Sequence, residues 1–336
     1  MAHGLDLPQA GSRERRPLRR DLLVRRRVRF SARPEGIPRR QRGEEMRMLA
    51  LFLLLAAGLW AKTILIVAAD APDFVLAAGG AVAAMIEAGD RAILVRVTNE
   101  DKDSYGLTAE ETALRSRAEC EQAAGILGIG KVVHLGYRAG ELGGVSPTEI
   151  RDRILFQVRL HKPDVMFIPN PYAEYVEQLD RHYVGMAAEE ARRAAALGNH
   201  QPPHEAVGLK THHTPELYYY AQPVDPRRRE PESTATFVPQ PVVKDIARTF
   251  AKKVRAAQAL KTSNHAMAMR VRERLEATGR RLPLLDTVDD ASVAKLAELN
   301  VAGLAKIGAA DSPYRMAEEF HYAGKDFQVP EKLRAK

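Results

Sequence analysis

The sequence predicts an α/β protein with a mainly parallel, doubly wound, Rossmann-like sheet flanked by helices, followed by a helical C-terminal region. Short apolar runs, which are typical of strands buried on both faces, alternate with longer helical segments from residue 63 onward. Some of the helical segments begin at a capping residue and end at a glycine. Strands that alternate with helices in this way pair in parallel and are joined by helical crossovers.

The predicted strands are 63–69, 92–98, 131–135, 164–169 and 216–221, and the first of them is a continuous apolar run. The predicted helices are 75–87, 108–127, 146–160 and a helix that starts near Asp180. Thr108 and Glu111 have the spacing of a capping box, and Gly128 follows the same helix. Pro147 suits the first position of the next helix.

In a doubly wound sheet, ligands bind beyond the carboxyl ends of the strands. The loops expected there are Asp70–Phe74, Asn99–Gly106, Gly136–Gly144 and Asn170–His182. Two carboxylates and one imidazole from separate loops could hold a divalent metal with an open position for water, and Asp70, Asp73 and His182 are such a set. Aspartates after strands are also common as helix caps, so the spacing alone leaves both interpretations open.

Residues 63–80, TILIVAADAPDFVLAAGG, resemble the opening motif of the PIG-L/LmbE-like deacetylase family, a strand followed by A-H-P-D-D-E and V-L-G-A-G-G. Further segments resemble that family in the same order, and together they cover roughly residues 62–322. These segments are Val97–Asn99, Arg117–Gly128, Leu135–Tyr137, Asp180–Gly185, Leu217–Tyr219 and Ala317–Phe320.

This resemblance implies a zinc-dependent hydrolase that removes the acetyl group from an N-acetylglucosamine-type sugar or glycoconjugate. It also implies that Asp73 keeps the position of a ligand aspartate, whereas Asp70 replaces a ligand histidine. Pro72 stands at the position of the general base and cannot accept a proton. Arg181 stands at the position of the second ligand histidine, one residue before His182.

Two interpretations follow from these departures. In the first, Asp70, Asp73 and His182 hold zinc or a harder metal, and a histidine supplies the missing base; the candidates are His212, His213 and His265. In the second, the chain is a catalytically inactive family member that binds a saccharide. In both, Asn99, Arg117 and Asp180 are the residues expected to contact the substrate.

The charge of the chain is concentrated at its start. The 336 residues have a formal net charge of +8, and residues 1–47, with 14 Arg and 6 acidic residues, account for all of it. A nucleic-acid partner is therefore not expected for the rest of the chain. The single cysteine, Cys120, excludes a disulfide framework, and no apolar run reaches the length of about 18 residues that a membrane span needs.

The expected organisation has three parts. Residues 1–45 are Arg-rich and lack apolar periodicity, so we expect a disordered leader, and Met46 or Met48 is a better translation start. An Arg-rich arm that binds nucleic acid is the alternative. Residues 46–61 have the pattern of a signal peptide, which predicts export to the periplasm or the medium. Residues 62–330 are expected to form one domain.

Overall fold

The computed structural model describes residues 61–172, 179–222, 240–310 and 312–323. Every described residue belongs to one compact unit, Leu53–Lys336. The predicted leader and the predicted signal peptide up to residue 60 lie outside the described residues. No helix among the residues that the structure describes has the length and apolar character needed to cross a bilayer.

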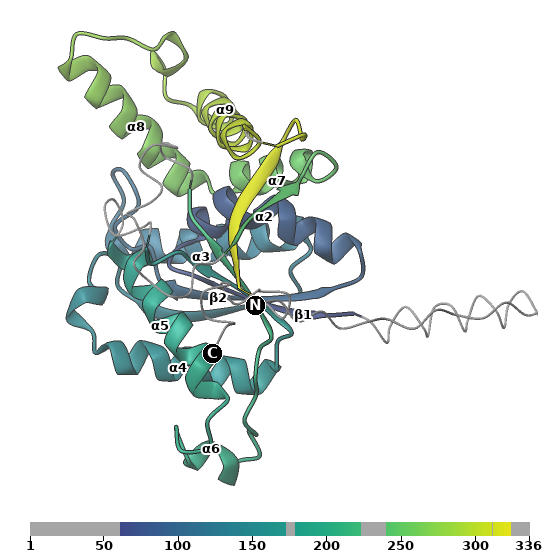
Figure 1. Ribbon diagram of the computed structural model, residues 1–336. Helices are drawn as coiled ribbons and strands as arrows, with labels where there is room; N and C mark the ends of the chain where they lie inside the picture. The colour runs from purple at the N-terminus through teal and green to yellow at the C-terminus, as the bar shows by residue number, and fades with distance from the viewer. Residues whose placement is uncertain (1–60, 173–178, 223–239, 311, 324–336) are drawn as a thin grey trace, which may run out of the picture. The chain divides into compact units, whose positions relative to one another are not determined.

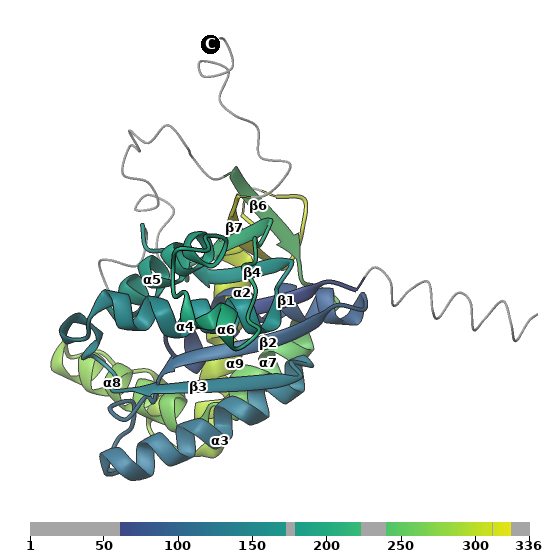
Figure 2. The same cartoon turned by 90° about the horizontal axis from the view of Figure 1, so that it is seen from below.

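The strands of this unit form one sheet in the order β3-β2-β1-β4-β5-β7-β6, as Figure 2 shows for most of them. The parallel strands are β1 (Thr63–Ala68), β2 (Arg91–Thr98), β3 (Lys131–Tyr137), β4 (Val165–Pro169) and β5 (Glu216–Tyr220). The antiparallel part consists of β6 (Gln240–Asp245) and β7 (Ala317–Ala323), with β7 between β5 and β6. The prediction of a mainly parallel sheet is confirmed.

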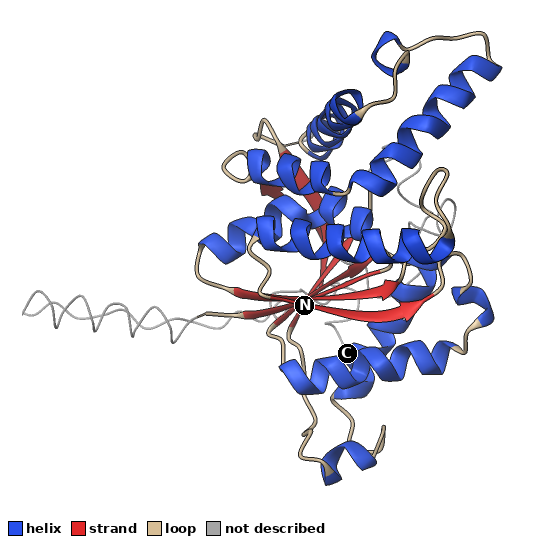
Figure 3. Ribbon diagram, turned by 180° about the vertical axis from the view of Figure 1, so that it is seen from behind, coloured by secondary structure: helices blue, strands red, loops and turns tan. Residues whose placement is uncertain are grey.

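Helices cover both faces of the sheet (Figures 1 and 3). The helices on one face are α2 (Ala71–Glu87), α3 (Ala109–Leu127) and α7 (Phe250–Ala259), and those on the other face are α4 (Pro147–His161) and α5 (Leu179–Ala195). The remaining helices are α6 (Pro203–Ala206), α8 (Lys261–Ala277) and α9 (Asp290–Gly308), and short 3-10 turns lie at Leu142–Gly144 and Pro283–Leu285.

Strand β1 explains why the core has two halves. Ile64 and Ile66 point into the cluster under α2 and α3, whereas Leu65 and Val67 point into the cluster under α4 and α5. All four side chains are fully buried, because successive residues of a strand face opposite sides of the sheet. The apolar run therefore reflects a strand that is covered on both faces.

Helix α2 begins at Ala71, four residues earlier than the sequence pattern predicts. The Asp70 side chain accepts a hydrogen bond from the Asp73 backbone N–H at 2.7 Å and caps the helix. Pro72 lies in the first turn, where a missing N–H costs no helical hydrogen bond. The predicted capping box at Thr108 and Glu111 is confirmed on α3, and Gly128 ends that helix with a φ of 93°.

The C-terminal region contains α7, α8 and α9, as predicted, but also the strands β6 and β7, which the sequence pattern did not show. Glu318 of β7 is buried and accepts hydrogen bonds from the backbone N–H groups of Gly80 (2.9 Å) and Ala81 (2.7 Å) in α2. Lys253 of α7 lies 2.7 Å from Glu318 and donates to the Leu76 carbonyl oxygen at 2.6 Å. This buried ion pair fastens β7 and α7 to the middle of α2.

Candidate functional site

The candidate site lies where β1 ends and α2 begins, at the carboxyl edge of the parallel strands. Asp70 is 8% exposed and Asp73 is fully buried. Both carboxylates lie in the first turn of the helix, where the positive end of the helix dipole favours negative charge. The Asp70 cap brings the two groups together, because its Oδ1 accepts from the Asp73 backbone N–H.

Arg181, from the first turns of α5, reaches across to both acids. Its Nε and Nη2 donate to the Asp70 carboxylate at 3.3 Å, and its Nε lies 3.3 Å from Asp73 Oδ1. The arginine is 8% exposed, so the contact is largely removed from solvent. A guanidinium has donors on several edges and can serve two carboxylates at once.

Tyr220, the last residue of β5, holds the other oxygen of Asp73. Its hydroxyl group lies 3.0 Å from Asp73 Oδ2 and 2.9 Å from the Val67 carbonyl oxygen, within hydrogen-bond distance of both. Burial raises the pKa of the Tyr220 phenol well above its usual value, and the neighbouring Asp73 charge adds to the shift. The tyrosine is therefore a neutral donor that fixes the orientation of Asp73.

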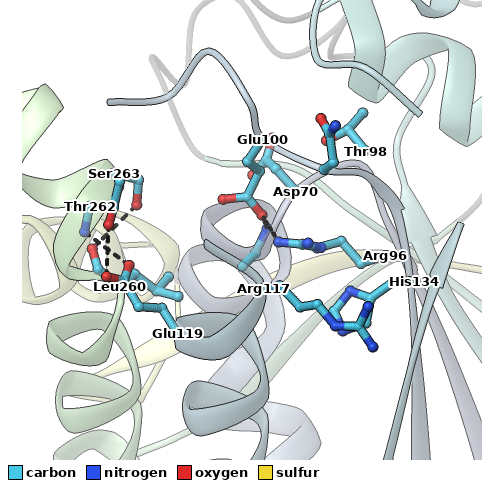
Figure 4. A network of polar contacts seen from close by, with 12 residues as sticks. Asp70, Arg96, Thr98, Glu100, Arg117, Glu119, His134, Leu260, Thr262 and Ser263 are labelled. Atoms are coloured by element: carbon cyan, nitrogen blue, oxygen red, sulfur yellow. Dashed lines mark hydrogen bonds and ion pairs between the residues drawn. The ribbon is translucent and has the colours of Figure 1, made fainter. Parts of the chain in front are cut away.

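A second buried ion pair, Arg96 with Glu100, lies beside Asp70 (Figure 4). Glu100 has a left-handed backbone (φ 58°) and accepts from the Ala71 backbone N–H at 2.7 Å and from Arg96 Nη1 at 3.0 Å. Burial raises the pKa of Glu100 to about 8; Arg96 opposes this shift and the charge of Asp70 adds to it. The start of α2 is thus surrounded by three acids, which are paired with two buried arginines, Arg181 and Arg96.

Two further acids lie nearby, Asp103 in the loop after β2 and Asp180 in the first turn of α5. Burial raises the pKa of Asp103 to about 6, and the charge of Asp70 adds to the shift. Asp180 accepts from the backbone N–H groups of Gly140 (2.5 Å) and Leu142 (3.3 Å), and burial raises its pKa as well. Asp180 thereby fixes the loop after β3.

A cavity of about 590 Å³ opens beside the loop that Asp180 fixes. The side chains around it are mixed, with an aromatic ring, an arginine and a carboxylate among glycines. The lining residues are Gly136, Tyr137, Arg138, Glu141, Gly144 and Val145. Asp180 bonds to the loop that lines this cavity and the next residue, Arg181, bonds to Asp70, so two adjacent residues of α5 connect the cavity with the paired acids.

The site does not have the donor set of a divalent-metal centre. Among the residues that the structure describes, no group of three His, Cys, Asp or Glu side chains could hold a metal ion. An ion between Asp70 and Asp73 would stand beside the Arg181 guanidinium. Like charges about 4 Å apart repel by about 4 kcal/mol per unit pair at an effective dielectric constant of about 20. His182 does not join the acids, because its Nδ1 lies 2.8 Å from the Pro171 carbonyl oxygen.

The candidate bases lie in different places. His212 contacts the Pro163 carbonyl oxygen at 2.8 Å, before β4 begins, so His212 and His213 lie at the amino edge of the sheet. They are therefore not beside Asp70 and Asp73, where the missing base was expected, because a loop that leads into a parallel strand ends at the edge opposite Asp70. His265 lies within α8, with its ring centroid 6.4 Å from that of Tyr105 in the loop after β2.

The predicted substrate contacts have local partners. Arg117 pairs with Glu121 at 3.2 Å on the exposed side of α3, next to His134 in Figure 4. Asn99 accepts from the Asp101 backbone N–H at 3.1 Å and shapes the loop after β2. Glu119 of the same motif as Arg117 accepts from the Thr262 backbone N–H (2.9 Å) and hydroxyl (2.7 Å) at the start of α8.

Sequence reasoning missed Tyr220, Arg96 and Glu100. Arg96 could have been recognised from the sequence, because a charged residue inside the apolar run AILVRVT must have a partner when the strand is buried. Tyr220 had no such signal, because 147 positions separate it from Asp73 in the sequence. Only the pairing of β5 with β4 brings the two together.

The fold and this acid-lined site define an α/β protein with a functional edge at the carboxyl ends of its parallel strands. Residues 65–192 match the family model described as PIG-L, GlcNAc-PI de-N-acetylase. Residues 65–192 thus form a PIG-L domain, and the resemblance to PIG-L/LmbE-like deacetylases that the motifs predicted is confirmed.

Individual proteins support the same fold. The chain is 24% identical over 161 residues to diacetylchitobiose deacetylase of Thermococcus kodakarensis, a match that spans 47% of this chain and 60% of that protein. The structure resembles N,N'-diacetylchitobiose deacetylase from Pyrococcus horikoshii with a TM-score of 0.61 and 21% identity, over 87% of this chain and 95% of that one. It also resembles GalB, a 4-carboxy-2-hydroxymuconate hydratase from Pseudomonas putida, with a TM-score of 0.53 and 21% identity, over 80% and 98% of the two chains.

Proposed function

We propose that this chain is a deacetylase-type protein that binds an N-acetylated sugar or glycoconjugate and whose amide hydrolysis is impaired. The observation that carries the proposal is Pro72. The family resemblance gives this position to the general base, and a proline in the first turn of α2 has no group that can take a proton from water. The loss of a general base typically lowers a rate by about 10²- to 10⁴-fold.

The family membership supports an N-acetylated sugar as the ligand, and so do the named activities of the two chitobiose deacetylases. The cavity beside β3 has suitable chemistry, because Tyr137 offers a ring face while Arg138 and Glu141 offer donors and acceptors for hydroxyl groups. The second candidate function is a metal-dependent N-acetyl-sugar deacetylase that uses another base, and the family match over residues 65–192 favours it.

The test is to incubate the purified full chain with N,N'-diacetylchitobiose, with and without added zinc. Acetate release and calorimetric binding are measured on the same preparation. We expect saturable binding and no multiple-turnover release of acetate. Arg138→Ala should weaken binding, whereas Arg115→Ala, at an arginine on α3 away from the cavity, should not.

Each opposite result is informative. Multiple turnovers of acetate release would overturn impaired hydrolysis and support the second candidate. If neither diacetylchitobiose nor N-acetylglucosamine binds, the proposed ligand class is overturned. We further propose that the protein is exported by means of residues 46–61, which have the signal-peptide pattern.

A further inference from the structure

We infer that Arg181 is a built-in cation that takes the place of a divalent metal between Asp70 and Asp73, so that this site is complete without a metal ion. The inference goes beyond the proposed function, because it concerns the charge balance of the site and not its ligand. It rests on the contacts of the three side chains.

Each oxygen of the two acids has a partner within the protein. Asp70 Oδ1 accepts from the Asp73 backbone N–H, and Asp70 Oδ2 accepts from Arg181 Nε at 3.3 Å. Asp73 Oδ1 lies 3.3 Å from Arg181 Nε, and Asp73 Oδ2 lies 3.0 Å from the Tyr220 hydroxyl. A divalent ion would have to displace a guanidinium that already neutralises part of this charge.

The burial of the three groups makes this arrangement stable. Asp73 is fully buried, and Asp70 and Arg181 are each 8% exposed. Two buried carboxylates in adjacent positions repel each other unless a cation lies between them. Metal ions and arginine both supply that cation, but arginine is supplied by the fold itself through α5, and its charge does not depend on metal supply or pH.

One substitution should therefore exchange one cation for the other. Arg181→His removes the guanidinium and adds an imidazole on the same turn of α5, so that two carboxylates and one imidazole face each other, which is a donor set that zinc accepts. The matched control is Arg192→His, three turns further along α5, where the native arginine donates to the Thr214 carbonyl oxygen at 3.0 Å.

The experiment measures metal content and thermal unfolding of the full chain after dialysis against zinc chloride and then against metal-free buffer. We expect the native protein to retain well below one zinc per chain and to unfold at the same temperature with and without EDTA. Arg181→His should retain about one zinc per chain, and EDTA should lower its unfolding temperature. Arg192→His should behave like the native protein.

Two results would overturn the inference. The first is stoichiometric zinc in the native protein together with an EDTA-sensitive unfolding temperature. The second is a folded Arg181→His variant that retains no more zinc than Arg192→His. If Arg181→His does not fold, Arg181→Lys is measured in its place. This variant keeps a cation beside the two acids, so the inference requires that it folds and retains well below one zinc per chain. Neither measurement uses sugar binding or acetate release, so failure here is distinct from failure of the proposed function.

Discussion

At the scale of single residues, the site depends on side chains that hold other side chains in place. Tyr220 orients Asp73 through its Oδ2, while Arg181 contacts its Oδ1, and Glu100 accepts from the first N–H of α2. Neither residue belongs to a motif of the first loop. Both act through buried hydrogen bonds, whose loss costs more than their formation contributes, because a buried group is left without a partner.

Tyr220→Phe tests whether the buried hydrogen bond from Tyr220 to Asp73 stabilises the protein. The substitution keeps the ring and removes the hydroxyl group, so it should lower the free energy of unfolding by about 1–3 kcal/mol. Urea denaturation measures the change. Tyr137→Phe is the control, because that hydroxyl bonds to Glu149 on an exposed surface and its loss should cost little. Equal effects of the two substitutions would contradict the role given to Tyr220.

Asp103→Asn tests the electrostatics of the acidic loops. Burial and the Asp70 charge raise the pKa of Asp103 to about 6, above that of the unfolded chain. The folded protein therefore binds more protons than the unfolded chain between about pH 4 and pH 6, and its stability falls as the pH rises through this range.

The Asp103→Asn variant has no carboxyl group at this position, so its stability should not fall between about pH 4 and pH 6. Its free energy of unfolding should match that of the native protein at about pH 4 and exceed it by about 1–3 kcal/mol at pH 8. Urea denaturation at several pH values measures the difference. Asp290→Asn, at a side chain that is 91% exposed, should show no such dependence. A constant difference across the range would argue against the raised pKa of Asp103.

At the scale of elements, α2 is fastened at both its start and its middle. Asp70 and Glu100 hold its first turn, while Glu318 and Lys253 hold the backbone from Leu76 to Ala81. Gly80 permits this, because a Cβ atom there would lie 2.8 Å from a methyl carbon of Ile246. Gly80 of the first motif thus serves the close packing of α2 against Ile246.

Lys253→Met should remove one partner of a fully buried ion pair and leave the Glu318 charge without compensation. The expected loss in the free energy of unfolding is about 3–5 kcal/mol. The neighbouring Lys252→Met is the matched control, because Lys252 pairs with Glu87 near the surface and should contribute at most about 1 kcal/mol. If both variants lose the same stability, the buried pair does not fasten α2.

The elements also show how far sequence reasoning reaches. All five parallel strands were predicted within two residues of their bounds. The clearest signals were β1 and β4, whose burial on both faces produces continuous apolar runs. Strand β7 was missed, since its sequence AEEFHYA contains two acids, one of which, Glu318, is buried by its contacts with α2 and Lys253. The Arg181 contact was missed for the same reason: a buried charge is explained by a partner distant in the sequence.

At the scale of the whole molecule, the N-terminal region and the rest of the chain have different charge. All of the formal net charge of +8 falls on residues 1–47, and a signal-peptide pattern follows at 46–61. An exported protein that starts at Met46 or Met48 would never contain the Arg-rich segment. The residues that form the sheet and its site would then belong to a chain with balanced charge.

The protein isolated from its natural cell should therefore begin at Lys62, after cleavage behind Ala61. Mass spectrometry of a Glu-C digest of the native protein measures this directly. A digest of the full recombinant chain is the control that peptides from residues 1–40 can be detected. The detection of such peptides in the native protein would contradict both the translation start and the export that we propose.

The position of β5 has a consequence for any shortened form of this protein. The segment that matches the family model ends at residue 192, before β5, β6 and β7 begin. A fragment cut at that point would expose the edge of β4, deprive Asp73 of Tyr220 and leave Gly80 and Ala81 without Glu318. We therefore expect that the segment matched by the family model does not fold autonomously, and a gene fragment that encodes it alone should yield insoluble protein.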